Sequence, residues 1–458
     1  MNLRSLNTLA ALAVGAMIST TAQAETLSDA LASTYRNSGL IDQNRAVLRA
    51  ADEDVAQAIS VLRPVFGYLA TVGYSDSITS QSTASSVSSA TLGISAEMLL
   101  YDFGRSQLSI DIAKETVLAT RAALIDAENT ALFNAVNAFQ GVRRSVVFVE
   151  LRENNVRLLI EQLRATRDRF EVGEVTRTDV SLSEASLAAA RSSLAAERGG
   201  LARAKEQYRT IVGDYPGTLA PAPAMPSIPA TEGEARAIAR QENPIAKQVQ
   251  HQVKAAELGV QIASRAMRPT LNAKGRIPLS DNESESANIG LELSGLIYQG
   301  GAISSQLRQA QARRDQARSQ LYTAVLQVDQ QVGNAYANLA VAIASIDASR
   351  QQVSAAELAL RGTREELQLG ARTTLDVLDQ EQEVLDARTN LVSAEVDRIV
   401  AAYQVLDSIG LMTAENLRLN VPIYDPAAYY NAVRNAPRGQ VSKQGQALDR
   451  VLRSIGKQ

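Results

Sequence analysis

The feature that most constrains this chain is an internal repeat. At an offset of 197 residues, LYDFG at positions 100–104 recurs as IYQGG at positions 297–301. The same offset aligns Gly173 with Gly370 and Asp179 with Asp376. A duplication that aligns all of these positions at one offset, without a gap, predicts two halves that contain the same structural elements in the same order.

The repeat sets the expected domain plan. Residues 25–213 form the first repeat and residues 231–411 form the second. Residues 214–230, between them, hold five of the twelve prolines, which predicts a semi-rigid linker without helix. Residues 412–458 are expected to be a C-terminal extension that is partly disordered.

Residues 1–24 are typical of a secretory signal peptide. Arg4 precedes an apolar stretch, and the segment closes with Ala-Gln-Ala. We therefore expect cleavage before Glu25 and export of the remaining chain. After Ala24 no stretch of about 18 or more residues is mostly apolar, so we expect no transmembrane helix.

The composition argues against several kinds of site. The chain has no Cys and a single His, so a disulfide, a thiolate nucleophile and a Cys-based metal site are all excluded. No nucleophile motif or Gly-rich cofactor loop is present. We expect neither an enzyme nor a bound cofactor or metal. The formal net charge of −3 gives no reason to expect a nucleic acid partner.

Helical patterns fill most of each half. Residues 26–62 and 231–267 are each expected to form a helix that ends at an Arg-Pro pair, because the residue before proline avoids helical dihedrals. Further along, residues 105–213 and 302–411 are each expected to form two long helices joined by a short turn. In the first half the longer helix has no proline from 105 to about 170, which corresponds to roughly 100 Å at 1.5 Å per residue. Heptads of apolar residues predict coiled-coil packing of these helices, with many Ala and Ser residues allowing close approach.

Between these helices, each half contains a segment with a period of two. Apolar residues alternate with polar ones over 66–74 and 92–100, and again over 271–279 and 289–297. These patterns predict one β-hairpin at about 64–101 and another at about 269–298, with residues 75–89 as an exposed loop. A strand of about ten residues with one apolar and one polar face is typical of a membrane barrel, although a soluble hairpin with one buried face gives the same pattern.

Four strands cannot close a barrel that has a lumen. If the strands lay open in a membrane, their edges would leave backbone hydrogen-bonding groups unsatisfied in lipid. Association of several chains would solve this problem, and three chains would supply twelve strands. The periodicity alone does not determine the number of chains.

Three sets of motifs resemble the TolC family of outer-membrane channel proteins. They are the Arg-Pro strand starts, the Tyr-x-x-Gly strand-to-helix junctions and the Gly-x-x-Thr-x-x-Asp-Val turns. The junctions fall at Tyr101 and Gly104 and at Tyr298 and Gly301, and the turns begin at Gly173 and Gly370. The match extends from residue 25 to about residue 419.

The resemblance implies a fold, a location and a set of partners. The fold is a homotrimer in which each chain contributes four strands to a twelve-stranded outer-membrane barrel, followed by a long α-helical tunnel across the periplasm of a Gram-negative bacterium. The function is that of an exit duct in tripartite efflux or type I secretion. The implied partners are outer-membrane lipid, an inner-membrane transporter of ABC or RND type and a periplasmic adaptor protein.

The two turns contain the candidate functional residues. Asp179 and Asp376 each follow a Thr by three positions, which predicts a capping box at a helix start. Asp379 is different, because its repeat partner is Leu182 and capping requires no acid there. If Asp376 and Asp379 face a pore, three chains would place six carboxylates around one constriction.

The resemblance also implies a gate at these turns. It assigns Asp376 and Asp379 to an acidic ring at the periplasmic entrance. It assigns Arg372 to a latch with Thr178 and Asp179 of the other turn. Leu367 stands where the compared family member has a Tyr that contributes to this latch, so one of its hydrogen bonds is expected to be missing or replaced.

Some alternatives remain open from the sequence. Tyr101 and Tyr298 could be aromatic residues at a membrane interface or ordinary packing residues. Gly104 and Gly301 are expected to permit tight junctions. The main rival function is a soluble periplasmic coiled-coil adaptor or scaffold, although an adaptor needs only one helical hairpin. The sequence does not identify the cargo.

Overall fold

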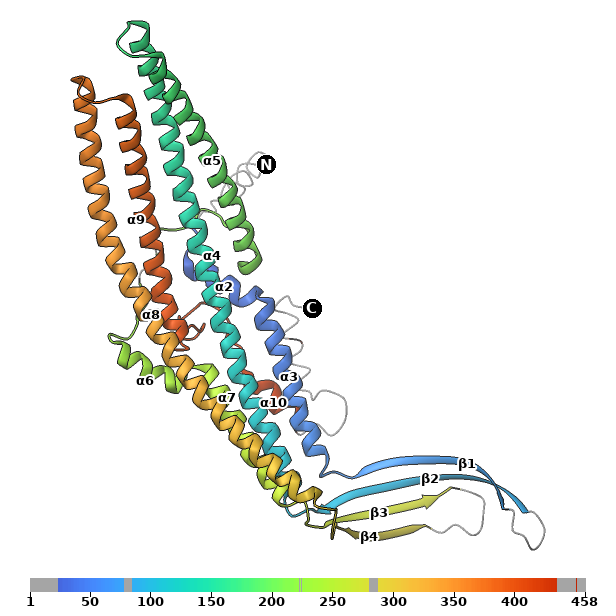
Figure 1. The fold of residues 1–458 in the computed structure, drawn as a ribbon. Coiled ribbons are helices and arrows are strands. Elements are labelled where there is room, and N and C mark those ends of the chain that lie inside the picture. The colour runs from blue at the N-terminus through green and yellow to red at the C-terminus, as the bar shows by residue number, and fades with distance from the viewer. Residues whose placement is uncertain are drawn as a thin grey trace, which may run out of the picture. The chain divides into compact units, whose positions relative to one another are not determined.

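The protein is described by a computed structural model over residues 24–77, 85–221, 223, 225–279, 287–434 and 450. Apart from Ala24, the predicted signal peptide lies outside these residues. The first half runs through α2 (Leu27–Asn37), α3 (Gly39–Ser60), β1 (Val65–Ser77), β2 (Ser85–Tyr101), α4 (Arg105–Glu171) and α5 (Arg177–Val212) (Figure 1). The second half runs through α6 (Glu232–Glu242), α7 (Pro244–Ser264), β3 (Thr270–Pro278), β4 (Asn288–Ser294), α8 (Ala302–Gln368), α9 (Thr374–Ser408) and α10 (Pro426–Val433).

The chain folds into two compact units, and each unit takes segments from both sequence repeats. Among the described residues, the unit that we call the helical unit falls within Met1–Ile41, Ala127–Ala239 and Gln330–Ile423. The described residues of the sheet unit fall within Asp42–Asp126, Arg240–Asp329 and Tyr424–Gln458. Both α4 and α8, at 67 residues each, supply residues to both units. The compact units therefore cut across the two repeats that we predicted as domains.

Among the described residues, the sheet unit contains one antiparallel sheet in the order β1-β2-β3-β4, in agreement with the prediction of four strands per chain. Tyr68 lies opposite Ile94, and Ile94 lies opposite Ile277. Because side chains alternate between the faces of a sheet, this register gathers the predicted apolar residues on one face. Where the structure describes its side chains, that face is uncovered: Tyr68, Val72 and Ile289 are 85%, 89% and 92% exposed.

The strands differ from the prediction at two places. β1 extends to Ser77 and β2 begins at Ser85, so both ends of the segment 75–89 are strand rather than loop. The backbone ladder continues there regardless of the polar side chains. β4 ends at Ser294, three residues earlier than predicted. Thr270 pairs with Ser294, and the preceding Pro269 has no N–H with which to continue the ladder.

Each helix expected before a hairpin is divided in two. The first breaks at Ser38, whose backbone is extended, and Asn37 Nδ2 at the end of α2 donates to Val212 O at 3.2 Å. The second breaks at Asn243, whose Oδ1 caps α7 by accepting from Ile245 N–H at 2.9 Å. Pro244 is the cause, because the residue before it avoids helical dihedrals while proline itself fits the first helical position.

In the helical unit, the core between the long helices is made of small and aliphatic residues. One cluster contains Leu159, Leu187 and Leu378, and so joins α4, α5 and α9. Two further clusters consist largely of alanines that let α8 and α9 approach closely, as predicted for coiled-coil packing: Ala335, Ala401 and Ala402, then Ala356 and Ala387.

The linker and the C-terminal extension both contact the folded units. Within 214–230, Leu219 forms a β-bridge with Glu25, and Pro229 O accepts from Tyr336 Oη at 2.7 Å. The extension contains α10, where Tyr429 Oη donates to Glu53 at 2.8 Å. The expected partial disorder of residues 412–458 stays a prediction, and residues 435–449 and 451–458 lie outside the described residues.

Candidate functional site

The turn between α8 and α9 is built from two local motifs. Gly370 has a φ of +72°, and Ala371 N–H donates to Glu366 O at 2.9 Å, which closes the end of α8. Thr373 then caps α9: its Oγ1 accepts from Asp376 N–H at 3.2 Å, while Asp376 Oδ2 accepts from Thr373 N–H at 2.8 Å. This reciprocal pair is the predicted capping box.

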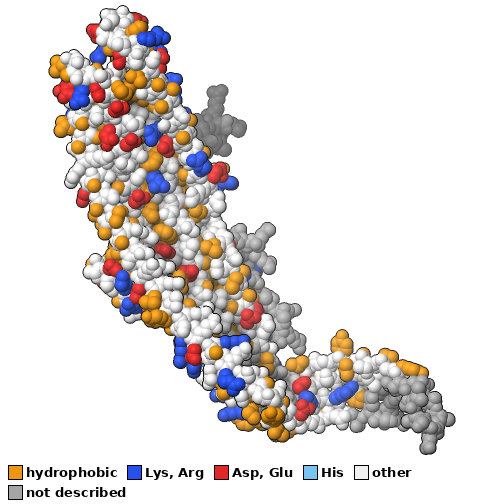
Figure 2. Space-filling model, viewed as in Figure 1, with side chains coloured by type: hydrophobic (Ala, Val, Ile, Leu, Met, Phe, Trp, Pro, Cys, Tyr) orange, Lys and Arg blue, Asp and Glu red, His pale blue; other side chains and the backbone are white. Residues whose placement is uncertain are grey.

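The turn between α4 and α5 repeats the same contacts. Gly173 has a φ of +79°, and Glu174 N–H donates to Arg169 O at 2.9 Å. Thr176 and Asp179 form the second capping box, with Thr176 N–H donating to Asp179 Oδ2 at 2.8 Å. Both turns lie at the same end of the helical unit (Figure 1), and acidic and basic side chains mix around them (Figure 2).

The two candidate ring acids differ in their contacts. Hydrogen bonds from the backbone and hydroxyl of Thr373, together with the nearby charge of Arg372, hold the pKa of Asp376 below its usual range. Asp379 is exposed and makes no hydrogen bond or ion pair with any residue that the structure describes. The two acids are three positions apart on α9, so they are neighbours on the surface of that helix.

Within this single chain, the three candidate latch residues do not meet. Arg372 Nε donates to Glu366 Oε2 at 2.9 Å, within its own turn. Asp179 is engaged by Thr176 in the capping box, and Thr178 is exposed. The sequence reading did not identify Glu366, although its position six residues before Arg372 brings the two together across the tight turn.

The junction from β2 to α4 depends on an acid that the sequence reading did not identify. Asp102 Oδ2 accepts from Ser106 N–H at 2.6 Å, and Asp102 Oδ1 accepts from Gly104 N–H at 3.0 Å. Partial burial favours the neutral acid, but these hydrogen bonds outweigh it and lower the pKa of Asp102. Gly104 has a φ of +78°, as expected for a tight junction, and the ring centroids of Tyr101 and Phe103 are 4.7 Å apart.

The junction from β4 to α8 lacks the Asp of the first junction. Gly300 and Gly301 both have positive φ values, +57° and +84°. Gln299 replaces the capping Asp, and Tyr298 is exposed beyond the end of β4. The repeat therefore preserves the glycine turn at both junctions but the acidic cap at only one.

Comparison with known proteins identifies the family. The model of the family described as "Outer membrane efflux protein" matches residues 30–214 and 236–411, which are most of the chain and lie in both repeats. The chain belongs to the outer membrane efflux protein family. This family consists of non-enzymatic transport ducts, and the protein is located in the outer membrane.

Individual relatives of the family agree along nearly the whole chain. The outer membrane efflux protein BepC of Brucella suis biovar 1 (strain 1330) is 34% identical over 421 residues, which cover 90% of this chain and 91% of BepC. The outer membrane protein TolC of Escherichia coli (strain K12) is 25% identical over 425 residues, covering 87% and 85%. The crystal structure of CusC has the same fold, with a TM-score of 0.75 at 17% identity over 84% of this chain and 92% of CusC.

The single histidine of this outer membrane efflux protein pairs with a carboxylate. His251 Nδ1 lies 2.7 Å from Glu115 Oε2, on α7 and α4. Among the described residues, no group of three or more His, Asp or Glu side chains is placed to hold a metal ion. Within those same residues, no helix combines the length and the apolar character needed to cross a membrane.

Near the two turns, this outer membrane efflux protein has an Arg–Glu pair in each repeat, and the two pairs differ in burial. Arg167 pairs with Glu184 at 2.5 Å, and Arg364 pairs with Glu381 at 2.9 Å, 197 positions later. The Glu184 side chain is 48% exposed, whereas that of Glu381 is 4% exposed. Burial raises the pKa of Glu381, and Arg364 opposes this rise. The sequence aligns the two acids but gives no signal of this difference.

Proposed function

We propose that three copies of this chain form the outer-membrane exit duct of a tripartite efflux system, gated at its periplasmic tip. The observation that carries this proposal is the sheet, which has one uncovered apolar face. Its two outer strands, β1 and β4, each pair with a neighbouring strand on one side only among the described residues. Lipid would cover the apolar face. Pairing of β1 with β4 of a neighbouring copy would satisfy the edges and close a twelve-stranded barrel.

The tip turns are proposed as the gate. In a trimer around a central axis, Asp376 and Asp379 would form a ring of six carboxylates that favours cations. Arg372 would hold the closed tip by binding Thr178 and Asp179 of an adjoining turn. Since Arg372 pairs with Glu366 in the single chain, Glu366 would compete with this latch.

The tip is also the proposed contact with a periplasmic adaptor and, through it, an inner-membrane transporter. Val172 and Leu369 stand immediately before the two turn glycines, and both apolar side chains are exposed. An adaptor could cover them. The family description and the name of BepC favour efflux over type I secretion, which stays the alternative cargo route.

Fractionation of cells tests the proposed function against a soluble periplasmic adaptor. We expect the processed protein in the outer-membrane fraction, extracted only by detergent, and we expect the extracted protein to conduct ions across planar lipid bilayers. Recovery in the periplasmic fraction without detergent, together with no bilayer conductance, would support the adaptor instead.

A further inference from the structure

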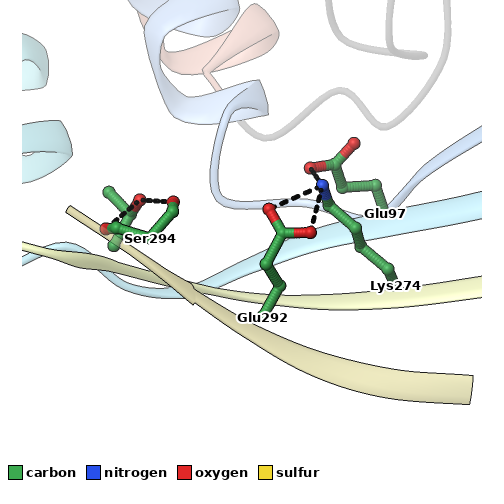
Figure 3. Close-up of polar contacts among 5 residues, drawn as sticks. Glu97, Lys274, Glu292 and Ser294 are labelled. Carbon is green, nitrogen blue, oxygen red and sulfur yellow. Dashed lines mark hydrogen bonds and ion pairs between the residues drawn. The ribbon is translucent and has the colours of Figure 1, made fainter. Parts of the chain in front are cut away.

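The polar face of the sheet carries a compact group of charges. Lys274 Nζ on β3 lies 2.9 and 3.0 Å from the two carboxylate oxygens of Glu292 on β4, and 3.7 Å from Glu97 Oε1 on β2 (Figure 3). One ammonium group thus connects two acids across three strands. We call Glu97, Lys274 and Glu292 the charge triad.

The charge triad and one neighbouring arginine form a belt across the sheet. Glu97 is directly opposite Lys274, and Arg276 lies two positions further along β3, about 7 Å away at 3.3 Å per residue. Beyond this belt, the described side chains of the polar face are uncharged. On one side Thr270 Oγ1 and Ser294 Oγ form a hydrogen bond at 3.0 Å. On the other side Thr71 and Thr91 form a second hydroxyl pair.

The stability of the sheet does not account for this arrangement. The three side chains of the triad are between 44% and 57% exposed, and ion pairs in water contribute about 0–1 kcal/mol. The sheet is already held by backbone ladders between all neighbouring strands. Charges on the wall of a water-filled conduit do, however, act on the ions that pass.

We propose that the charge triad is a second ion filter inside the barrel, in which Lys274 keeps the preference for cations low. This inference rests on the proposed function, because the triad faces a lumen only if three sheets close around it. Each triad has two carboxylates and one ammonium group, and Arg276 lies beside it. The belt is therefore balanced in the native chain. Replacing Lys274 by a neutral residue leaves two carboxylates per chain opposed only by Arg276.

Reversal potentials under a salt gradient test the filter. The measurement uses full-length protein in planar bilayers with about 10 mM salt on the dilute side, where the Debye length is about 30 Å and wall charges act across a lumen. The tip acids are neutralised in every variant by Asp376→Asn and Asp379→Asn, so that the proposed acidic ring does not contribute. We expect Lys274→Gln to raise the permeability ratio of potassium to chloride roughly twofold or more.

Two further variants are needed to interpret that result: one with the opposite expected effect and one control. Glu292→Gln should shift the ratio toward chloride, and it does so without leaving two unscreened acids that could disturb folding. Lys247→Gln removes a partly exposed lysine outside the sheet, paired with Glu242, and should leave the ratio unchanged.

The outcomes separate the filter from the duct. If the parent protein conducts but both Lys274→Gln and Glu292→Gln keep its permeability ratio, the filter is wrong and the duct stands. Equal shifts from Lys274→Gln and Lys247→Gln would also overturn the filter, since position would not matter. If the parent forms no conducting channel, the proposed duct is wrong and the filter is rejected with it.

Discussion

At the scale of single residues, Arg372 has two possible partners with opposite consequences. Its ion pair with Glu366 keeps the guanidinium within its own turn, whereas the proposed latch needs it at Thr178 and Asp179. Arg372→Ala should therefore loosen the closed tip and raise the single-channel conductance in planar bilayers. Glu366→Gln should release Arg372 to the latch and lower the conductance.

The neighbouring Glu365 provides the control for this pair of variants. It is exposed on the same turn of α8, so Glu365→Gln removes an equal charge without affecting the Arg372 ion pair. Conductance changes of the same sign in Arg372→Ala and Glu366→Gln would rule out competition between the two partners.

Asp52 on α3 predicts a dependence of stability on pH. Its carboxyl is fully buried, and neither oxygen has a hydrogen-bond partner among the described residues. Burial raises the pKa of Asp52 to about 6, with Arg121 lowering it and Glu53 raising it. The folded state therefore binds a proton more readily than the unfolded chain, so stability falls as the pH rises from about 4 to 6.

The variant Asp52→Asn tests this dependence. Above pH 6 the asparagine avoids a buried charge that costs at most about 3 kcal/mol, given 1.36 kcal/mol per pKa unit. We expect the thermal midpoint of the variant to exceed that of the parent at pH 7.5, with the difference shrinking at pH 4.5. The exposed Asp54 on the same helix serves as control through Asp54→Asn. A difference for Asp52→Asn that is independent of pH would contradict the assignment.

At the scale of elements, the turn glycines determine how the helix pairs reverse direction. Gly370 has a positive φ, and an added Cβ would meet no atom within 4 Å. Gly141, within α4, also has open space but helical dihedrals. Gly370→Ala should therefore destabilise the protein by about 1–2 kcal/mol through backbone strain alone, whereas Gly141→Ala should stabilise it by about 0.5–1 kcal/mol.

Urea unfolding followed by the helical circular dichroism signal measures this contrast. The two substitutions add the same methyl group to an uncrowded site, so packing does not separate them. Equal effects on the unfolding midpoint would show that the left-handed conformation of Gly370 does not constrain the turn.

Sequence patterns predicted the elements well where the signal is local. The first long helix begins at Arg105 as predicted, and both capping boxes form at the predicted Thr and Asp residues. The break at Asn243 was not predicted, although an Asn-Pro pair favours a helix boundary. The break at Ser38 has a weaker local signal, and the adjacent Asn37 donates a hydrogen bond to Val212, 175 positions away.

At the scale of the whole molecule, the duplication predicted which elements recur but not how they associate. Each compact unit draws on both repeats, because long helices with similar faces pack against one another across the repeat boundary. The candidate site shows the same division. The capping contacts of Asp376 were predicted from its position three residues after Thr373. The pairing of Arg372 with Glu366 and the burial of Glu381 depend on three-dimensional packing.

The central claim is that three chains close one barrel through β1 and β4. The chain has no Cys, so engineered pairs report without interference. We propose Tyr68→Cys on β1 combined in turn with Ile289→Cys, Leu291→Cys or Leu293→Cys on β4. These side chains share the apolar face, so at least one pair should meet the distance that a disulfide requires.

The decisive measurement is the size of the covalent species after oxidation in outer-membrane fragments, on non-reducing gels. A closed ring predicts that at least one double variant gives a product that stops at three chains, while each single variant stays at one chain. A ladder that continues past three chains, or single chains in all three pairings, would contradict the trimeric barrel.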